Sequence, residues 1–157
     1  MRTMLTLMVL FMAVTGPVTA QNFVTDRFDT GKENPELEIT FIGHGTLMCR
    51  WGDLIVHVDP VSREADYTTL PDADVIVITH EHGDHLDAGA IAHIEKENTV
   101  IFLTKTCRKK LDRGTVIKNG DTRKSRGIVI EAVPAYNIKH LRSGGSPYHP
   151  KGGATDM

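Results

Sequence analysis

Four side chains that bind transition metals fall within six consecutive positions near the middle of the chain. They are His80, His82, Asp84 and His85, and they directly follow the apolar, β-branched run at residues 75–79. Imidazole nitrogens and carboxylate oxygens are the ligands that hold Zn²⁺ and similar first-row ions. The residue types and their spacing therefore predict a metal site at the end of a buried strand.

The local geometry of this segment favours two metal ions. If the chain leaves the strand in extended form, the rings of His80 and His82 point to the same side. Gly83 tolerates unusual backbone angles, so a turn there would bring Asp84 and His85 to the same cavity. Two ligand groups in one loop suit cations about 3.5–4 Å apart, as in two-metal hydrolases. The alternative, a polar loop with satisfied hydrogen bonds, explains four clustered ligands poorly.

Short apolar runs separated by turn residues predict the elements that position this loop. Strands are expected at residues 37–42, 46–51, 54–58, 75–79, 99–103 and 115–118, and a hairpin at 123–126 and 128–134. Helices are expected after Asp87, which suits an N-cap, and at 105–111. The strands first form a meander and later alternate with helices. This order predicts an α/β (α+β) fold with a mixed sheet and helices on its outer face.

Composition limits the classes of partner. The chain has 157 residues, of which 40% are hydrophobic and 24% charged, as expected for one globular domain with a core. The formal net charge is −2. Binding of nucleic acid would need a concentrated basic face, which this charge gives no reason to expect. The basic cluster at residues 108–110 is interpreted as a solvated helix face. A nuclease would share the metal motif, but the sequence shows no basic patch or set of stacking aromatics that would support this function.

The first twenty residues differ from the rest of the chain. A positive start is followed by an apolar run at 5–14 and small residues up to Ala20. Such a run is too short to span a bilayer comfortably and predicts a signal peptide; a membrane anchor or a buried helix are the alternatives. We expect a periplasmic or secreted protein without stable membrane insertion, a loose lead-in at 21–36 and one domain at 37–157.

The two cysteines, Cys49 and Cys107, lie far apart in the sequence and form no CxxC pair. In an oxidising compartment they could form one disulfide. The alternative is that both are small, buried apolar residues, and the sequence leaves the choice open.

The HxHxDH spacing resembles the signature of the metallo-β-lactamase superfamily, in which this motif follows a buried strand. Within the superfamily, the chain is similar to bacterial hydrolases related to the L-ascorbate-6-phosphate lactonase group. Further matching segments occur in order between residues 37 and 152: Phe41-Ile42-Gly43-His44-Gly45-Thr46, His57-Val58-Asp59-Pro60, Val133-Pro134-Ala135-Tyr136-Asn137 and His149-Pro150-Lys151-Gly152. The resemblance implies a four-layer αββα sandwich with a dinuclear site at the edge between two sheets.

The resemblance also implies a role for each residue of the motif. His80 and His82 would bind the first metal ion, and Asp84 and His85 would bind the second. Asp84 would in addition be the catalytic residue that shuttles a proton. The implied cofactor is Zn²⁺, two per complete site, with Mn²⁺ or Fe²⁺ as alternatives.

Other site residues implied by the resemblance lie outside the motif. A histidine after the strand that ends near Pro134 would complete the first metal site; His149 is the first candidate and His140 the second. Asp59 would orient a metal-bound histidine, although it could instead be a turn residue before a proline. His44 would line the cavity or simply belong to its turn.

The implied reaction is hydrolysis of an ester, lactone, amide or phosphodiester in a small-molecule substrate. Two cations make water nucleophilic at neutral pH and polarise the substrate's carbonyl or phosphoryl oxygen. The sequence has neither a GxxxxGK[ST] loop nor a serine in a GxSxG setting, which disfavours phosphate-loop and covalent chemistry.

Superfamily members continue beyond the segment that matches residues 149–152. They add further strands, a metal-bridging aspartate in a GDT-like segment and a late metal-binding histidine, whereas this sequence ends at Met157. We therefore expect a C-terminally truncated domain with an incomplete second sheet. The alternative function is a non-catalytic or degenerate metal-binding fragment. Oligomeric state is open, although pairing of two chains would cover a bare sheet.

Overall fold

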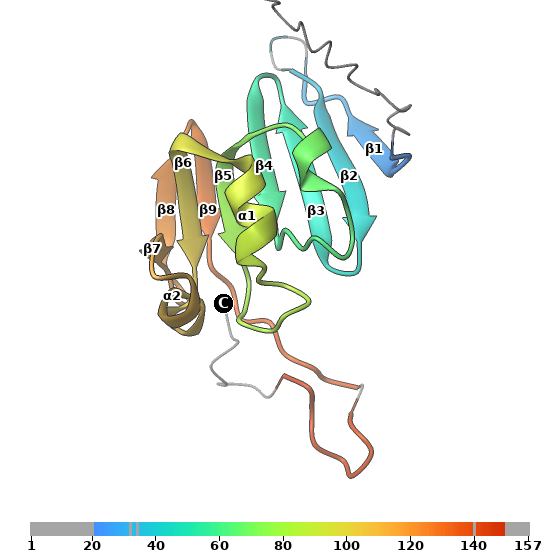
Figure 1. The fold of residues 1–157 in the computed structure, drawn as a ribbon, viewed down its shortest axis with the longest axis vertical. Helices are drawn as coiled ribbons and strands as arrows, with labels where there is room; N and C mark the ends of the chain where they lie inside the picture. The colour runs from blue at the N-terminus through green and yellow to red at the C-terminus, as the bar shows by residue number, and fades with distance from the viewer. Residues whose placement is uncertain (1–20, 32, 34, 140, 150–157) are drawn as a thin grey trace, which may run out of the picture.

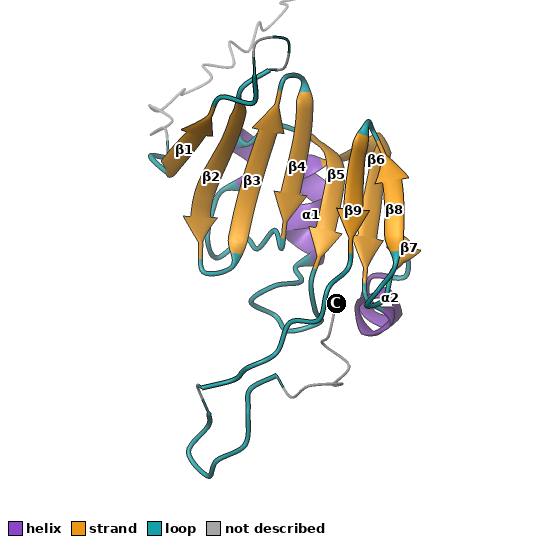
Figure 2. Ribbon diagram, turned by 180° about the vertical axis from the view of Figure 1, so that it is seen from behind, coloured by secondary structure: helices purple, strands orange, loops and turns teal. Residues whose placement is uncertain are grey.

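Two sheets and two α-helices make up the described part of the chain. The computed structural model describes residues 21–31, 33, 35–139 and 141–149. Within them, a seven-stranded sheet carries helices on one face and a two-stranded sheet on part of the other (Figures 1 and 2). The expected signal peptide, residues 1–20, lies outside the described residues.

The large sheet is mixed, with its strands in chain order. The strands are β1 Val24–Phe28, β2 Leu37–Gly43, β3 Thr46–Trp51, β4 Leu54–Val58, β5 Ala73–Ile78, β6 Glu95–Leu103 and β7 Thr115–Val116. Pairing is antiparallel from β1 to β4 and parallel from β4 to β7. The predicted meander followed by crossovers is confirmed. The predicted bounds were wrong at the start of β6, which begins earlier, and at the end of β7, which stops sooner.

The lead-in expected at 21–36 is not a loose segment throughout, because it contains the edge strand β1. Val24 pairs with Phe41 of β2. The Arg27 side chain donates to Glu38 Oε1 at 2.8 Å across the same pair of strands. Polar and charged side chains are typical of edge strands, where they discourage pairing with another chain. The same polarity made this segment look like a loop in the sequence.

The helices begin at capping residues. Helix α1, Ala88–Ile94, starts after Asp87, whose side chain accepts hydrogen bonds from the backbone N–H groups of Gly89 and Ala90. Helix α2, Lys105–Leu111, starts after Thr104, which caps it in the same way. Both predicted helices are confirmed, whereas the 3₁₀ turn η1, Tyr67–Thr69, was not predicted. Among the described residues, no helix has the length and apolar character needed to cross a bilayer.

One core lies between the large sheet and the helices. Its fully buried side chains include Ile76 and Ile78 of β5, Ile91 and Ile94 of α1, and Leu103 of β6. Burying one such side chain stabilises the fold by about 1.5–3 kcal/mol. This core fixes the end of β5, the strand from which the histidine loop departs.

A second, smaller core lies on the opposite face of the sheet. Strands β8, Thr122–Ser125, and β9, Ile128–Glu131, form the predicted hairpin and lie over β5 and β6 (Figure 2). β8 begins and ends one residue earlier than predicted, and β9 ends at Glu131 rather than at Pro134. Val75, Phe102 and Ala132 are buried between the two sheets. The hairpin forms a second, two-stranded sheet, and a second sheet is what the resemblance implied.

The cysteines lie on opposite faces of the large sheet and are both free. Cys107 is buried in the core beneath the helices. Cys49 of β3 pairs with Val56, which packs on the opposite face of the sheet. Burial raises the pKa of both thiols. The alternative of a small, buried apolar residue holds for Cys107, whereas Cys49 is only half-buried.

Candidate metal centre

The loop from Thr79 to Asp87, between β5 and α1, carries the HxHxDH residues. The backbone N–H groups of His85 and Leu86 donate to the His82 carbonyl at 3.0 and 2.9 Å, which folds the loop back on itself. The predicted turn at Gly83 is present, but it does not require glycine. The φ of Gly83 is not among the positive values of this chain, and a Cβ there would meet nothing within 4 Å. The hydrogen-bonded turn, rather than glycine's freedom, brings the two ends of the motif together.

Three histidines form one donor group, called the inner group: His80, His82 and His149. One ring nitrogen from each lies within 4.8 Å of the corresponding nitrogens of the other two. The ring centroid of His80 is 4.7 Å from that of His82 and 4.8 Å from that of His149. Such a set of three imidazoles is able to hold a divalent cation.

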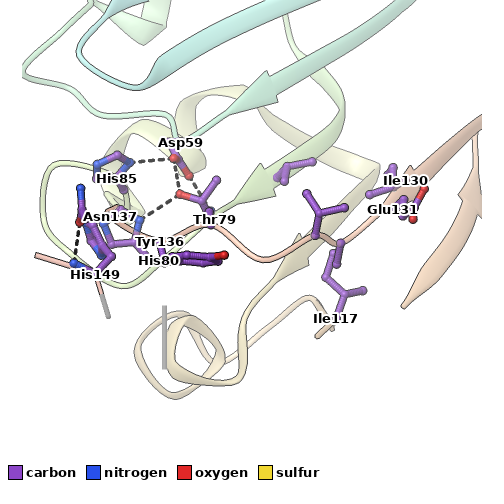
Figure 3. A pocket seen from close by; sticks show the side chains of 14 residues that line it. Asp59, Thr79, His80, His85, Ile117, Ile130, Glu131, Tyr136, Asn137 and His149 are labelled. Carbon is purple, nitrogen blue, oxygen red and sulfur yellow. Dashed lines mark hydrogen bonds and ion pairs between the residues drawn. The ribbon is translucent and has the colours of Figure 1, made fainter. Parts of the chain in front are cut away.

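His149 reaches the inner group because its loop closes on itself. Its backbone N–H donates to Asn137 Oδ1 at 2.7 Å, and the Asn137 N–H donates to the His149 carbonyl at 2.9 Å (Figure 3). Asn137 belongs to a segment that matched the superfamily, but the sequence assigned it no role. The other candidate, His140, lies outside the described residues.

Asp59 lies at the centre of a hydrogen-bond network that holds two of the histidines (Figure 3). Its side chain is 2% exposed and accepts from Thr79 N at 2.7 Å, Thr79 Oγ1 at 2.5 Å and His85 Nδ1 at 2.8 Å. Its φ of 47° also fits a turn before Pro60. Because all three donors point at one buried carboxylate, Asp59 does more than shape a turn: it orients its neighbours.

The same network fixes which ring nitrogens are free. A carboxylate can only accept, so His85 Nδ1 donates to Asp59, and in the neutral ring Nε2 then keeps a lone pair. The one hydroxyl proton of Thr79 goes to Asp59, so His80 Nδ1 must donate to Thr79 Oγ1, 3.0 Å away. His80 Nε2 then also keeps its lone pair. Hydrogen bonding through Asp59 thus prepares one nitrogen on each ring for a metal ion.

The environment of His80 fits a metal ligand. The residue is 7% exposed, and its Nε2 is buried without a hydrogen-bond partner among the described residues. Burial, followed by repulsion from His85, His82 and His149, lowers the pKa of His80 to about 4. A buried polar atom left unpaired costs about 1–3 kcal/mol. A cation bound at this neutral nitrogen would remove that cost, so the residues fit the metal ion that the motif implies.

A second donor group, called the outer group, consists of His44, Asp84 and His85. One donor atom from each lies within 4.8 Å of the others, and His44 Nε2 is 3.2 Å from Asp84 Oδ2. Burial acts to raise the pKa of Asp84, but its own backbone N–H and the nearby histidines lower it below the usual value. The carboxylate is therefore ionised at neutral pH.

The two groups adjoin, since the ring centroids of His80 and His85 are only 3.9 Å apart. Asp59 also lies within 4.8 Å of donor atoms on these two rings. Its oxygens already accept three hydrogen bonds, so we assign it to orienting the rings. The remaining described histidines stand apart: His57 is buried and bonds to the Pro71 carbonyl, and His93 is exposed on α1.

A cavity of about 530 Å³ opens beside the metal centre. His80, His85 and His149 form one end, and the apolar side chains of Val77, Ile117, Ile130 and Ala132 form much of the wall (Figure 3). This volume falls within the range of small-molecule pockets. Contrary to one expectation, His44 does not line this cavity and lies against Asp84 instead.

Residues 38–152 match the family model described as the beta-lactamase superfamily domain. A UPF0173 metal-dependent hydrolase from Archaeoglobus fulgidus is 31% identical over 114 residues, 67% of this chain and 48% of that protein. One from Pyrococcus horikoshii is 30% identical over 113 residues, 64% of this chain and 48% of that protein. The chain thus spans about half the length of these curated relatives.

A solved structure has a similar fold. The crystal structure of a putative metal-dependent hydrolase from Parabacteroides distasonis superposes with a TM-score of 0.74 and is 52% identical in sequence. The superposition covers 83% of this chain and 58% of the other.

Proposed function

The chain belongs to the metallo-β-lactamase superfamily, and from that premise we propose that it is a metal-dependent hydrolase whose reaction centre is the pair of donor groups at the end of β5. One observation carries the proposal. His80, His82 and His149 converge although His149 is remote in the sequence, and His80 presents a buried, unpaired nitrogen to the point where they meet. A loop of ordinary surface histidines would not leave this nitrogen unsatisfied.

Two divalent cations are proposed, one at each donor group, with Zn²⁺ as the first choice and Mn²⁺ or Fe²⁺ as alternatives. When bound, such ions polarise a substrate oxygen and make water nucleophilic at neutral pH. The chain's own residues do the rest. His80 offers a neutral nitrogen, Asp59 fixes the rings of His80 and His85, and the ionised carboxylate of Asp84 would accept a proton at Oδ1 and return it to the leaving group.

The proposed substrate is a small molecule with an ester, lactone, amide or phosphodiester bond. The cavity of about 530 Å³ supports a small ligand, and its largely apolar wall supports an apolar group next to the bond that is cleaved. Glu131 and Tyr136 also face this cavity and would contact polar parts of the ligand.

The test is metal-dependent turnover by the chain itself. Metal-free protein would be reconstituted with Zn²⁺, Mn²⁺ or Fe²⁺ and assayed against a lactone, an aryl ester, a β-lactam and an aryl phosphodiester. We expect turnover of at least one class that rises with metal occupancy, disappears on chelation and survives in the control His93→Ala. A folded, metal-loaded chain that turns over none of these would instead support the non-catalytic, metal-binding alternative.

We propose in addition that the protein is exported to the periplasm or beyond, on the sequence of residues 1–20. Expression of the full chain in a Gram-negative host should give a mature product that begins at Gln21, as measured by mass spectrometry of fractionated cells. A cytoplasmic product that retains Met1 would contradict export.

A further inference from the structure

The turn between β2 and β3 has an unusual backbone conformation at His44. Its φ is 49°, in the left-handed region that residues with a Cβ seldom adopt. Strained conformations of this kind persist where the surroundings hold them, and they are frequent at functional sites. The superfamily motif does not include His44, so the structure must supply the reason for this conformation.

The two residues that follow His44, Gly45 and Thr46, hold the turn close to the metal centre. A Cβ at position 45 would lie 2.8 Å from His85 Cε1, so only glycine lets the turn approach that ring. Thr46 is 1% exposed, and its hydroxyl donates to the Asp59 carbonyl at 2.7 Å. The turn is therefore attached to the same residue that orients His85, and His44 is carried into the outer group.

The distance between His44 and Asp84 is compatible with a shared cation. Two ligands of one tetrahedral zinc ion, with bonds of about 2.0–2.2 Å, lie about 3.3–3.5 Å apart. His44 Nε2 and Asp84 Oδ2 are 3.2 Å apart, at the long end of the range for an N–H···O hydrogen bond and close to the ligand spacing. One donor atom of His85 also lies within 4.8 Å of this pair, so the three side chains are close enough to share one cation.

We propose that His44 is the third protein ligand of the outer cation, together with Asp84 and His85. His85 offers Nε2, because its Nδ1 donates to Asp59. Two imidazoles and one carboxylate are a donor set that Zn²⁺ takes in sites with an open position for water. These three ligands of the outer cation all lie between positions 44 and 85. This inference rests on the proposed function, since it concerns the second of the two cations.

The variant that tests the inference is His44→Asn. Asparagine tolerates the left-handed conformation and keeps a side-chain donor near Asp84, but it removes the imidazole ligand. His93→Ala, an exposed histidine outside both groups, is the matched control. Co²⁺ titration followed by visible absorption, together with metal per chain by mass spectrometry, measures both sites in the full chain.

We expect two equivalents in the wild type and in H93A, and one in H44N. The second equivalent should bind H44N more than about 100-fold more weakly, which exceeds the 10–100-fold effect of losing a residue that only orients a ligand. Equal binding by H44N and the wild type, at one equivalent or two, would overturn the inference alone. A wild-type chain that binds no metal would overturn the proposed function as well.

A second measurement needs no variant and therefore remains valid if H44N does not fold. Wild-type protein with ¹⁵N-labelled histidine would be loaded with ¹¹³Cd and examined for cadmium–nitrogen coupling. We expect coupling at His44 Nε2 and at His85. Coupling at His85 without coupling at His44 would contradict the inference.

Discussion

The inner and outer donor groups adjoin but are built differently. The inner group surrounds His80, which is 7% exposed, and depends on His149 from a distant loop. The outer group is open to solvent, since the side chains of His44 and Asp84 are 49% and 38% exposed. Water competes less for a buried nitrogen than for an exposed carboxylate. We therefore expect the inner group to bind its cation more tightly, and the outer group to depend more on neighbours that hold its ligands in place.

The largest effect is expected from His80→Ala, because this change removes the buried nitrogen on which the inner group is centred. The affinity for the inner cation should fall by more than about 100-fold, beyond the effect of losing an orienting residue. Hydrolytic turnover should be lost with it. Calorimetric titration with Zn²⁺ measures the loss, with H93A as the control. A folded H80A chain that binds two ions at wild-type affinity would contradict the distinction between the groups.

Asp59→Asn should have the next largest effect. The amide of asparagine presents an N–H₂ group where Asp59 presents acceptors to Thr79 and His85, so the rings of both groups lose their fixed orientation. We expect a 10–100-fold loss of affinity for both cations, the range found for residues that orient metal-bound histidines. The same titration gives the answer. Unchanged affinity at both groups would show that Asp59 only shapes the turn before Pro60.

Thr79→Val should affect the inner group and leave the outer group unchanged, so it tests whether the two groups are oriented independently. Valine keeps the β-branched shape but lacks the hydroxyl that lies between Asp59 and His80 Nδ1, while the bond from His85 to Asp59 remains. The inner affinity should fall by about 10-fold, at the lower end of that range, and the outer affinity should stay the same. An equal loss at both groups would show that they are not oriented independently.

The smallest effect concerns the stability of the metal-free protein. The pKa of His80 is lowered to about 4, below its ordinary value of 6.5, so the folded state resists a proton that the unfolded chain accepts. Stability is therefore greatest above about pH 6.5 and falls towards pH 4, by at most about 1.4 kcal/mol per pH unit for one histidine. Chemical denaturation of metal-free wild type and H80A should show a shallower fall in the variant. Identical pH profiles would contradict this.

Where side chains alternate or run continuously apolar, the sequence predicts the fold well. β3, β4 and α2 have the predicted bounds, because buried faces and a capping threonine leave a regular pattern. β1 was missed because an edge strand need not bury either face. The loop motif predicts which residues carry chemistry, since ligand types at fixed spacing are rare by chance.

The contacts that complete the site leave no pattern in the sequence. The pairing of Asn137 with His149 closes a loop without periodicity, and its effect depends on where that loop lies over the sheet. The approach of His44 to Asp84 depends on the register of β2 with β3 and on glycine at position 45. Both contacts become visible only when loops that are distant in the sequence lie side by side.

The most direct test of the central claim is the number of zinc ions that the wild-type chain holds at neutral pH after removal of loosely bound metal. Plasma mass spectrometry on folded protein should find close to two ions per chain, and one should remain when a weak chelator removes the more exposed ion. A folded chain with no bound zinc would contradict the claim that the donor groups at the end of β5 form a metal centre.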